Sequence, residues 1–236
     1  MSPPSPSTIS TMESQPVTMV FFDLDNTLFD HKHSLYQAMS AVRHISPLLH
    51  DIPLKVLIEK YNEALNHAYD RYLRNETAYE DQDAEKKNRS AMPGSIRTLT
   101  RLRENGYRTA IITNDQTDNQ VEKARAIGVL DLVECITTSE EVGHPKPDVR
   151  TFQYALEKLE VKPYCAYMVG DSVEADIKGA IKAGITPILY APSSNSSLEV
   201  LFEREVPVIR HFDQLHMVLV LPLKTILNRV SPHRDR

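Results

Sequence analysis

The sequence predicts an α/β protein with a Rossmann-like parallel sheet, helices on both faces of the sheet, and a small all-helical cap inserted after the first strand. Three observations support this fold class. From residue 93 onwards, short apolar runs alternate with helical patterns, as in parallel sheets. Residues 31–91 contain no glycine and repeat their apolar side chains at helical spacing. One apolar strand, at residues 17–22, precedes both blocks.

The elements of the α/β part follow from apolar runs and from stop signals. We predict strands at residues 17–22, 108–113, 132–137, 166–169 and 186–189, and an edge strand at 207–210. We predict helices at residues 95–105, 117–127, 148–159, 174–183 and 213–221. Glycines end three of these helices, and Asp148 is placed to cap the third. Residues 191–197 form a loop rich in Pro, Ser and Asn.

The domain boundaries follow from the changes in pattern. The α/β core takes residues 17–30 and 92–222, and the helical cap takes residues 31–91. Within the cap, Pro47 and Pro53 bracket the connection between two helices. Tyr69, Tyr72 and Tyr79 extend its apolar stripe, either as packing or as a wall of the substrate site. The tails at 1–16 and 223–236 are polar, the second one basic, and we expect both to be disordered.

Composition excludes several classes of function. Apolar residues make up 41% and charged residues 25% of the chain, which is ordinary for a globular protein. A net charge of -5 does not favour nucleic acid or an anionic membrane as a partner. No apolar run approaches the roughly 18 residues of a membrane span, and the N-terminus lacks a secretory pattern. The two cysteines are far apart in sequence, so we expect reduced thiols. Without a secretory pattern, we expect a cytoplasmic location. We also expect a monomer or a homodimer.

Two aspartates end the first strand. The last four residues of the strand are apolar, and Asp23 and Asp25 follow at positions i and i+2, so their side chains point the same way. Two carboxylates leaving a buried strand on one side repel each other, and a divalent cation removes that repulsion. The alternative is an acidic turn, in which Asn26 and Thr27 act as turn or capping residues.

Polar groups also lie at three later positions where a strand ends or a helix begins. They are Thr113 with Asn114, Lys146, and Asp171 with Ser172 and Asp176. The carboxyl ends of parallel strands meet at one edge of the sheet, where ligands bind. This set suits a phosphoryl group with Mg²⁺, and a carboxylate can attack phosphorus. Each residue also has an ordinary interpretation: a strand cap, a solvated lysine, a helix N-cap and a surface aspartate.

These four motifs resemble those of the haloacid dehalogenase-like superfamily of hydrolases. They are Asp23-Leu24-Asp25-Asn26-Thr27, Thr113-Asn114, Lys146-Pro147, and Gly170-Asp171 through Asp176. Their order and spacing match over about residues 17–221, and the helical insert lies where that superfamily places one type of cap. The third and fourth motifs resemble the small-metabolite phosphatase branch, which includes pyrimidine nucleotidases and N-acylneuraminate-9-phosphatases.

The resemblance implies a phosphatase that hydrolyses a small phosphate ester with Mg²⁺. It makes Asp23 the nucleophile and Asp25 the general acid and base. The metal would be held by Asp23, by the backbone carbonyl of Asp25 and by Asp171. Thr113 and Asn114 would bind the phosphoryl oxygens, and Lys146 would neutralise their charge. Asp176, Thr27 and Ser172 would not touch the substrate but would contact Lys146 or the water molecules on the metal.

Other functions on the same fold stay open at this point. A phosphomutase or other phosphotransferase would share all four motifs, and a prenyl or terpenoid phosphate phosphatase is compatible with them. A dehalogenase needs no second aspartate, so Asp25 argues against that activity. A binding protein without turnover is disfavoured by the complete set of motifs, although fold alone does not prove function.

Overall fold

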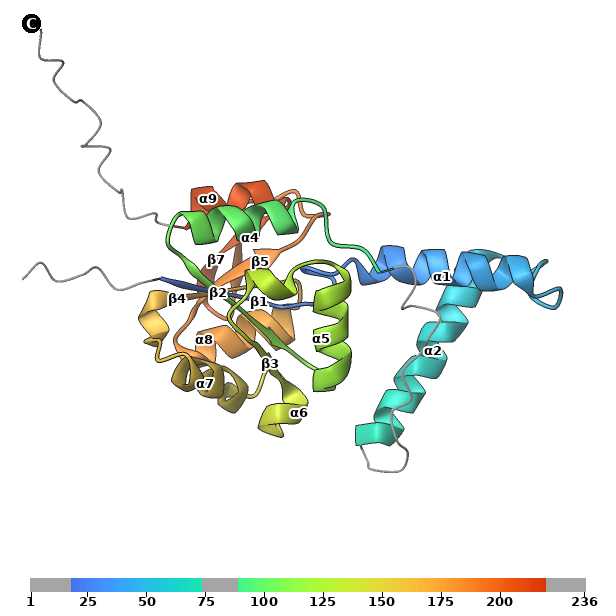
Figure 1. Ribbon diagram of the computed structural model, residues 1–236, viewed down its shortest axis with the longest axis horizontal. Coiled ribbons are helices and arrows are strands. Elements are labelled where there is room, and N and C mark those ends of the chain that lie inside the picture. The colour runs from blue at the N-terminus through green and yellow to red at the C-terminus, as the bar shows by residue number, and fades with distance from the viewer. Residues whose placement is uncertain (1–17, 74–88, 220–236) are drawn as a thin grey trace, which may run out of the picture.

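The computed structural model of the protein describes residues 18–73 and 89–219. In this part of the chain, seven strands form one sheet in the order β3-β2-β1-β4-β5-β7-β6 (Figure 1). All neighbouring strands are parallel except β6 and β7. In chain order the strands are β1 (Met19–Phe22), β2 (Arg108–Thr113), β3 (Ile136–Thr138), β4 (Ala166–Gly170), β5 (Thr186–Tyr190), β6 (Leu198–Leu201) and β7 (Arg204–Ile209). The predicted fold class is confirmed.

Helices cover both faces of the sheet (Figure 1). One face carries α4 (Ser95–Glu104), α5 (Thr117–Ala126) and α9 (Leu215–Val218), and the other carries α7 (Val149–Lys158) and α8 (Gly179–Ala183). The alternation of β1 explains the two layers, because Val20 and Phe22 belong to one hydrophobic core and Met19 and Phe21 to the other. All four side chains are fully buried, and β1 is an interior strand that holds the motif following it.

The sequence placed two strands imperfectly. Residues 130–132 form a 3₁₀-helix, so β3 begins four residues later than predicted. The predicted edge strand is β7, but it lies between β5 and β6, and β6 is the edge. The β6–β7 hairpin escaped prediction because its two-residue turn consists of Phe202 and Glu203 at φ 50° and 62°. Such left-handed turns are normally marked by Asn or Gly.

The predicted cap contains the helices α1 (His31–Ile45) and α2 (Leu54–Leu73), which extend away from the sheet in Figure 1. Asp30 caps α1 by accepting a hydrogen bond from the backbone N–H of His33 at 2.9 Å. The two linkers to the core run side by side, because Asp30 N–H donates to the carbonyl of Ser90 at 2.9 Å. The cap as a separate domain stays a prediction.

Several predictions fall outside the described residues. They concern the tails at 1–16 and 223–236, the side chains of Tyr69 and Tyr72, and the whole of Tyr79. Within the described ranges, every helix is too short or too polar to cross a membrane. Cys135 and Cys165 are both free and partly buried.

Candidate active site

A tight turn after β1 carries the two aspartates. Asp23 continues the strand and donates its N–H to the carbonyl of Val169 on β4 at 2.9 Å. The chain then folds back, and Phe29 N–H donates to the carbonyl of Leu24 at 2.8 Å. Asn26 takes a left-handed φ of 60°, a conformation that asparagine tolerates better than most residues. The turn thereby fixes both carboxylates at the carboxyl edge of the sheet.

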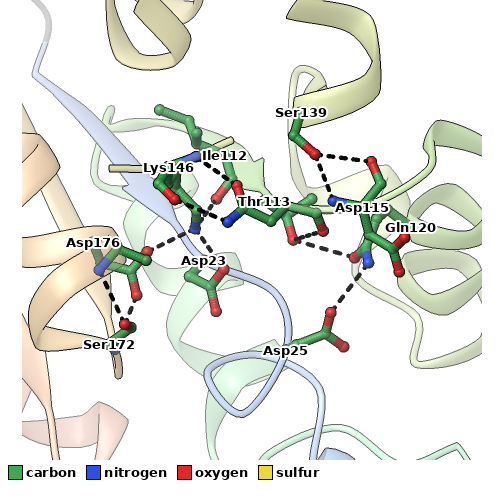
Figure 2. A network of polar contacts seen from close by, with 12 residues as sticks. Asp23, Asp25, Ile112, Thr113, Asp115, Gln120, Ser139, Lys146, Ser172 and Asp176 are labelled. Carbon is green, nitrogen blue, oxygen red and sulfur yellow. Dashed lines mark hydrogen bonds and ion pairs between the residues drawn. The ribbon is translucent and has the colours of Figure 1, made fainter. Parts of the chain in front are cut away.

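Lys146 is buried and donates hydrogen bonds to three different residues. Its side chain is 2% exposed, and its ammonium donates to Asp23 Oδ1 at 2.7 Å and to Asp176 Oδ1 at 2.6 Å. A third bond runs to the carbonyl of Ile112 at 2.7 Å, so all three ammonium hydrogens have a partner (Figure 2). The interpretation of Lys146 as a solvated loop charge is therefore wrong.

The segment after β4 positions Asp176. Ser172 caps a π-helical turn, Val173–Lys178, and its backbone N–H donates to Asp176 Oδ2 at 3.0 Å. A β-carbon added to Gly170 would lie 2.2 Å from that oxygen, so only glycine leaves room for the carboxylate. Asp176 is 1% exposed and Asp171 is not the helix cap, so the surface and N-cap interpretations of these two residues are both wrong.

Three carboxylates could hold a metal ion. Asp23, Asp171 and Asp176 each offer one oxygen, and these oxygens lie within 4.8 Å of one another. Clustered carboxylate oxygens are the ligands that Mg²⁺ prefers in proteins. The cluster includes Asp176, which was predicted to contact the lysine or the metal waters and not the metal itself. The cluster does not include the side chain of Asp25. Ligation through the Asp25 carbonyl stays a prediction.

Thr113, Asn114 and Thr27 also lie at this edge of the sheet. The Asn114 side chain accepts from Lys146 N–H at 2.7 Å and donates to the Lys146 carbonyl at 3.1 Å, so it holds the loop that carries the lysine. The Thr113 hydroxyl lies 3.3 Å from Gln120 Oε1. The Thr27 hydroxyl is buried and has no hydrogen-bond partner among the described residues. The roles predicted for these three residues stay predictions.

Helix α5 contributes two residues that the sequence analysis missed. Lys123 donates to both oxygens of Asp25, at 2.9 and 3.1 Å, and Gln120 donates to Asp25 Oδ2 at 3.1 Å. A signal was available, because Gln120 and Lys123 share the apolar face of a helix with Ala124 and Ile127 at positions i, i+3, i+4 and i+7. Long polar side chains on a buried face need partners inside the protein.

The predicted site residues surround one small open pocket of about 170 Å³. Its lining consists of Asp23, Asp25, Thr113, Asn114, Lys146, Asp171, Ser172, Ala175 and Asp176. All of these except Ala175 were singled out from the sequence. A pocket of this size is smaller than the roughly 300–1,000 Å³ typical of whole-ligand sites, so it suits the phosphoryl end of a substrate.

The sequence model of the haloacid dehalogenase-like hydrolase family matches residues 17–184. The chain belongs to this family. A glyceraldehyde 3-phosphate phosphatase of Methanothermobacter thermautotrophicus is 29% identical over 223 residues, which cover 85% of this chain and 98% of the relative. A ribulose-1,5-bisphosphate 5-phosphatase of Halopiger xanaduensis is 40% identical over 107 residues, or 45% of each chain.

Solved structures of the family share the fold. A crystal structure of a haloacid dehalogenase-like hydrolase from Bacillus subtilis bound to magnesium covers 87% of this chain and 100% of its own, at 19% identity and a TM-score of 0.68. A phosphatase of the family from Thermococcus onnurineus covers 87% and 99% of the two chains, at 22% identity and a TM-score of 0.65. Together with the phosphatase relatives, family membership makes this haloacid dehalogenase-like protein a phosphoric monoester hydrolase.

Several carboxyl groups surround one lysine on the Asp23 side of this hydrolase's site. Burial raises the pKa of Asp23 from 3.8 to about 8, because Lys146 only partly offsets the burial and Asp176 adds to it. Burial and Asp176 likewise raise the pKa of Asp171 to about 6. Lys146 stays charged, since the two carboxylates outweigh its own burial and raise its pKa. One buried ammonium thus faces more carboxylates than it can neutralise.

The opposite balance holds at Asp25. Burial raises the pKa of this carboxyl, but the charge and hydrogen bonds of Lys123 outweigh the burial and bring the pKa below its usual value. The pKa values of two aspartates separated by one residue are therefore shifted in opposite directions. In the free site Asp23 holds a proton more readily than Asp25 does, which is the reverse of what a nucleophile and a general acid need.

Proposed function

We propose that this protein is a Mg²⁺-dependent phosphatase that forms an aspartyl-phosphate on Asp23 and uses Asp25 as its general acid and base. The observation that carries the proposal is the buried cluster of Asp23, Lys146 and Asp176, with Asp171 beside it. A nucleophile with a pKa of about 8 is mostly protonated at neutral pH. A divalent cation would replace that proton and free the carboxylate to react.

The proposed reaction has two steps, formation of the aspartyl-phosphate and its hydrolysis. An oxygen of Asp23 attacks phosphorus, the ester P–O bond breaks, and the leaving oxygen takes a proton from Asp25. Asp25 must therefore be protonated in the complex with substrate, although Lys123 lowers the pKa of this carboxyl in the free enzyme. Water then attacks the aspartyl-phosphate and gives a proton to Asp25, and the bond between phosphorus and Asp23 breaks to release phosphate. Lys146 holds one oxygen of Asp23 throughout, which orients the carboxylate and offsets charge.

The residues present fit a bound Mg²⁺. Asp23, Asp171 and Asp176 offer the clustered oxygens, and the backbone carbonyl of Asp25 is a further candidate. The ion, when bound, would polarise the phosphoryl oxygens and stabilise the charge that develops on them.

The substrate that we propose is a small phosphorylated sugar or aldehyde. Support comes from the relatives, which are phosphatases of glyceraldehyde 3-phosphate and of ribulose 1,5-bisphosphate. The pocket of about 170 Å³ is suited to a phosphoryl group and little more. The remainder of the substrate would then contact the helical block that extends from the core.

The test measures free phosphate from a panel of sugar, triose and nucleoside monophosphates, with Mg²⁺ and with EDTA. We expect release from at least one triose or pentose phosphate, loss of release in EDTA, and loss in Asp23→Asn, whose amide is isosteric but a poor nucleophile. Full activity in EDTA or in a clean Asp23→Asn preparation would contradict the mechanism. Transfer of the phosphoryl group to a second metabolite instead of water would identify a phosphotransferase.

A further inference from the structure

The ammonium of Lys123 contacts two residues of the turn after β1, Asp25 and Phe29. Its ammonium donates to Asp25 Oδ1 at 2.9 Å and to Oδ2 at 3.1 Å. It also lies 5.7 Å from the centre of the Phe29 ring, at the other end of the turn. The side chain is 8% exposed, so water competes little for its charge. Two contacts on the lysine thus fix the turn that carries Asp25.

Gln120 connects the same carboxylate to the second motif. Its amide nitrogen donates to Asp25 Oδ2 at 3.1 Å, and its amide oxygen accepts from the Thr113 hydroxyl at 3.3 Å (Figure 2). The residue is fully buried. The orientation of the Asp25 carboxylate is therefore coupled to the hydroxyl that is predicted to bind the phosphoryl group.

Stability alone is a poor reason for this arrangement. Desolvating an ion pair costs free energy that its attraction often does not recover, and apolar replacements can be neutral or stabilising. Gln120 and Lys123 occupy the buried face of α5, where leucine or methionine would pack without that cost. A buried ion pair that meets the pocket is better explained by the direction in which it holds a reacting group.

We propose that Lys123 and Gln120 are positioning residues that aim the Asp25 carboxyl group at the leaving oxygen and at the attacking water. This inference rests on the function proposed above. Neither residue lines the pocket. Lys123 acts through Asp25, so its removal should slow proton transfer and leave substrate binding nearly unchanged. Gln120 acts through Asp25 and also accepts from the Thr113 hydroxyl, so the dependence of its effect on Asp25 is what tests its positioning role.

A double-mutant cycle tests the proposal. Wild type and Asp23→Asn are assayed first, so that failure of the proposed function shows before any positioning variant is made. Lys123→Met and Gln120→Met are then made in wild type and in Asp25→Asn. With an alkyl phosphate that the wild type hydrolyses, we expect each to lower kcat by ~10–100-fold, the usual effect of removing a group that orients a site ligand, with KM within about threefold. In Asp25→Asn, neither substitution should lower kcat further.

Three controls keep the result interpretable. Lys158→Met removes a comparable lysine, which pairs with Glu141 at 2.7 Å and lies over the Tyr154 ring on α7, and it should match wild type. Lys123→Arg keeps the charge and should recover part of kcat. Gln120→Met removes no charge, so it decides the question if Lys123→Met fails to fold. Losses of equal size with and without Asp25, or a rise in KM alone, would overturn the proposal.

Discussion

Two buried lysines donate hydrogen bonds to carboxylates that line the pocket, Lys146 to Asp23 and Asp176 and Lys123 to Asp25. Lys146 lies between Asp23 and Asp176, close to Asp171, so negative charge is in excess on its side. Lys123 donates to both oxygens of Asp25, which also receives a hydrogen bond from the neutral Gln120, and the pKa of this carboxyl is lowered. In the proposed function, one short motif thus supplies a carboxylate that needs a divalent cation, Asp23, and one that does not, Asp25.

The largest expected effect is that of replacing Asp25. Asp25→Asn should slow formation of the aspartyl-phosphate by ~10²–10⁴-fold with an alkyl phosphate, the range for general acid catalysis. With para-nitrophenyl phosphate the loss should be much smaller, because nitrophenolate leaves without a proton. Single-turnover rates for the two substrates measure the difference. Equal losses, at unchanged metal affinity, would remove Asp25 from the acid and base role.

A second prediction compares the lysines directly. Lys146→Met leaves the Asp176 carboxylate, 2% exposed, without its cation, and breaking a buried ion pair costs ~3–5 kcal/mol. Lys123→Met leaves Asp25, whose side chain is 30% exposed, so water can take over part of the lost interaction and the cost should be smaller. Urea unfolding in EDTA measures both variants. A Lys123 variant that proved as unstable as the Lys146 variant would refute the contrast.

The pH dependence of stability should separate the two aspartates. The folded pKa of Asp23 is about 8 against 3.8 in the unfolded chain, so the folded state binds the extra proton. The metal-free protein should therefore lose stability as the pH rises from about 4 to about 8. The Asp25 pKa is lowered, so its contribution is present above pH 3.8 and is lost in acid.

Thermal unfolding in EDTA between pH 5 and 8 measures the first of these trends. Asp171, whose pKa is raised to about 6, contributes to the same trend at the acid end. Asp23→Asn should therefore flatten the curve mainly between pH 6 and pH 8 and exceed wild type in stability near pH 8, where Mg²⁺ should restore the wild type. A stability difference between wild type and Asp23→Asn that did not change from pH 6 to pH 8 would show that Asp23 is ionised without metal.

The smallest predicted effect is that of replacing tyrosines in the helical block at residues 31–91. If the helical block at 31–91 selects the substrate, then replacing Tyr69, Tyr72 or Tyr79 by alanine should change KM or substrate preference by several-fold. Hydrolysis of para-nitrophenyl phosphate should stay near the wild-type rate, since its small leaving group needs few cap contacts. An unchanged substrate profile in all three variants would remove the tyrosines from specificity.

Most of the fold could be predicted because its signals are local. The apolar run before Asp23 and the glycines after the helices indicate strands and helix ends without any knowledge of the tertiary structure. The β6–β7 hairpin was missed because its left-handed turn is made of Phe202 and Glu203, residues that carry no turn signature. There, pairing between strands determines the backbone against the local preference.

The site could be predicted wherever a polar residue ends or directly follows a strand, as Thr113 ends β2 and Asp23 and Asp171 follow β1 and β4. Lys123 and Gln120 were missed because they lie within a helix, and their meeting with Asp25 depends on how α5 packs against the sheet. Asp176 was recognised as part of the fourth motif, but its place beside Asp23 follows from a π-helical turn that the sequence does not reveal.

The central claim is that Asp23 carries the phosphoryl group between the two steps. Asp25→Asn is mixed with para-nitrophenyl phosphate and Mg²⁺ and quenched in acid within the first turnover, and the trapped phosphate is located by peptide mapping. Because water activation is impaired, we predict near-stoichiometric, hydroxylamine-labile phosphate on Asp23, and none in the Asp23→Asn/Asp25→Asn double variant. Turnover with no trapped phosphate, or phosphate on any other residue, would contradict the account.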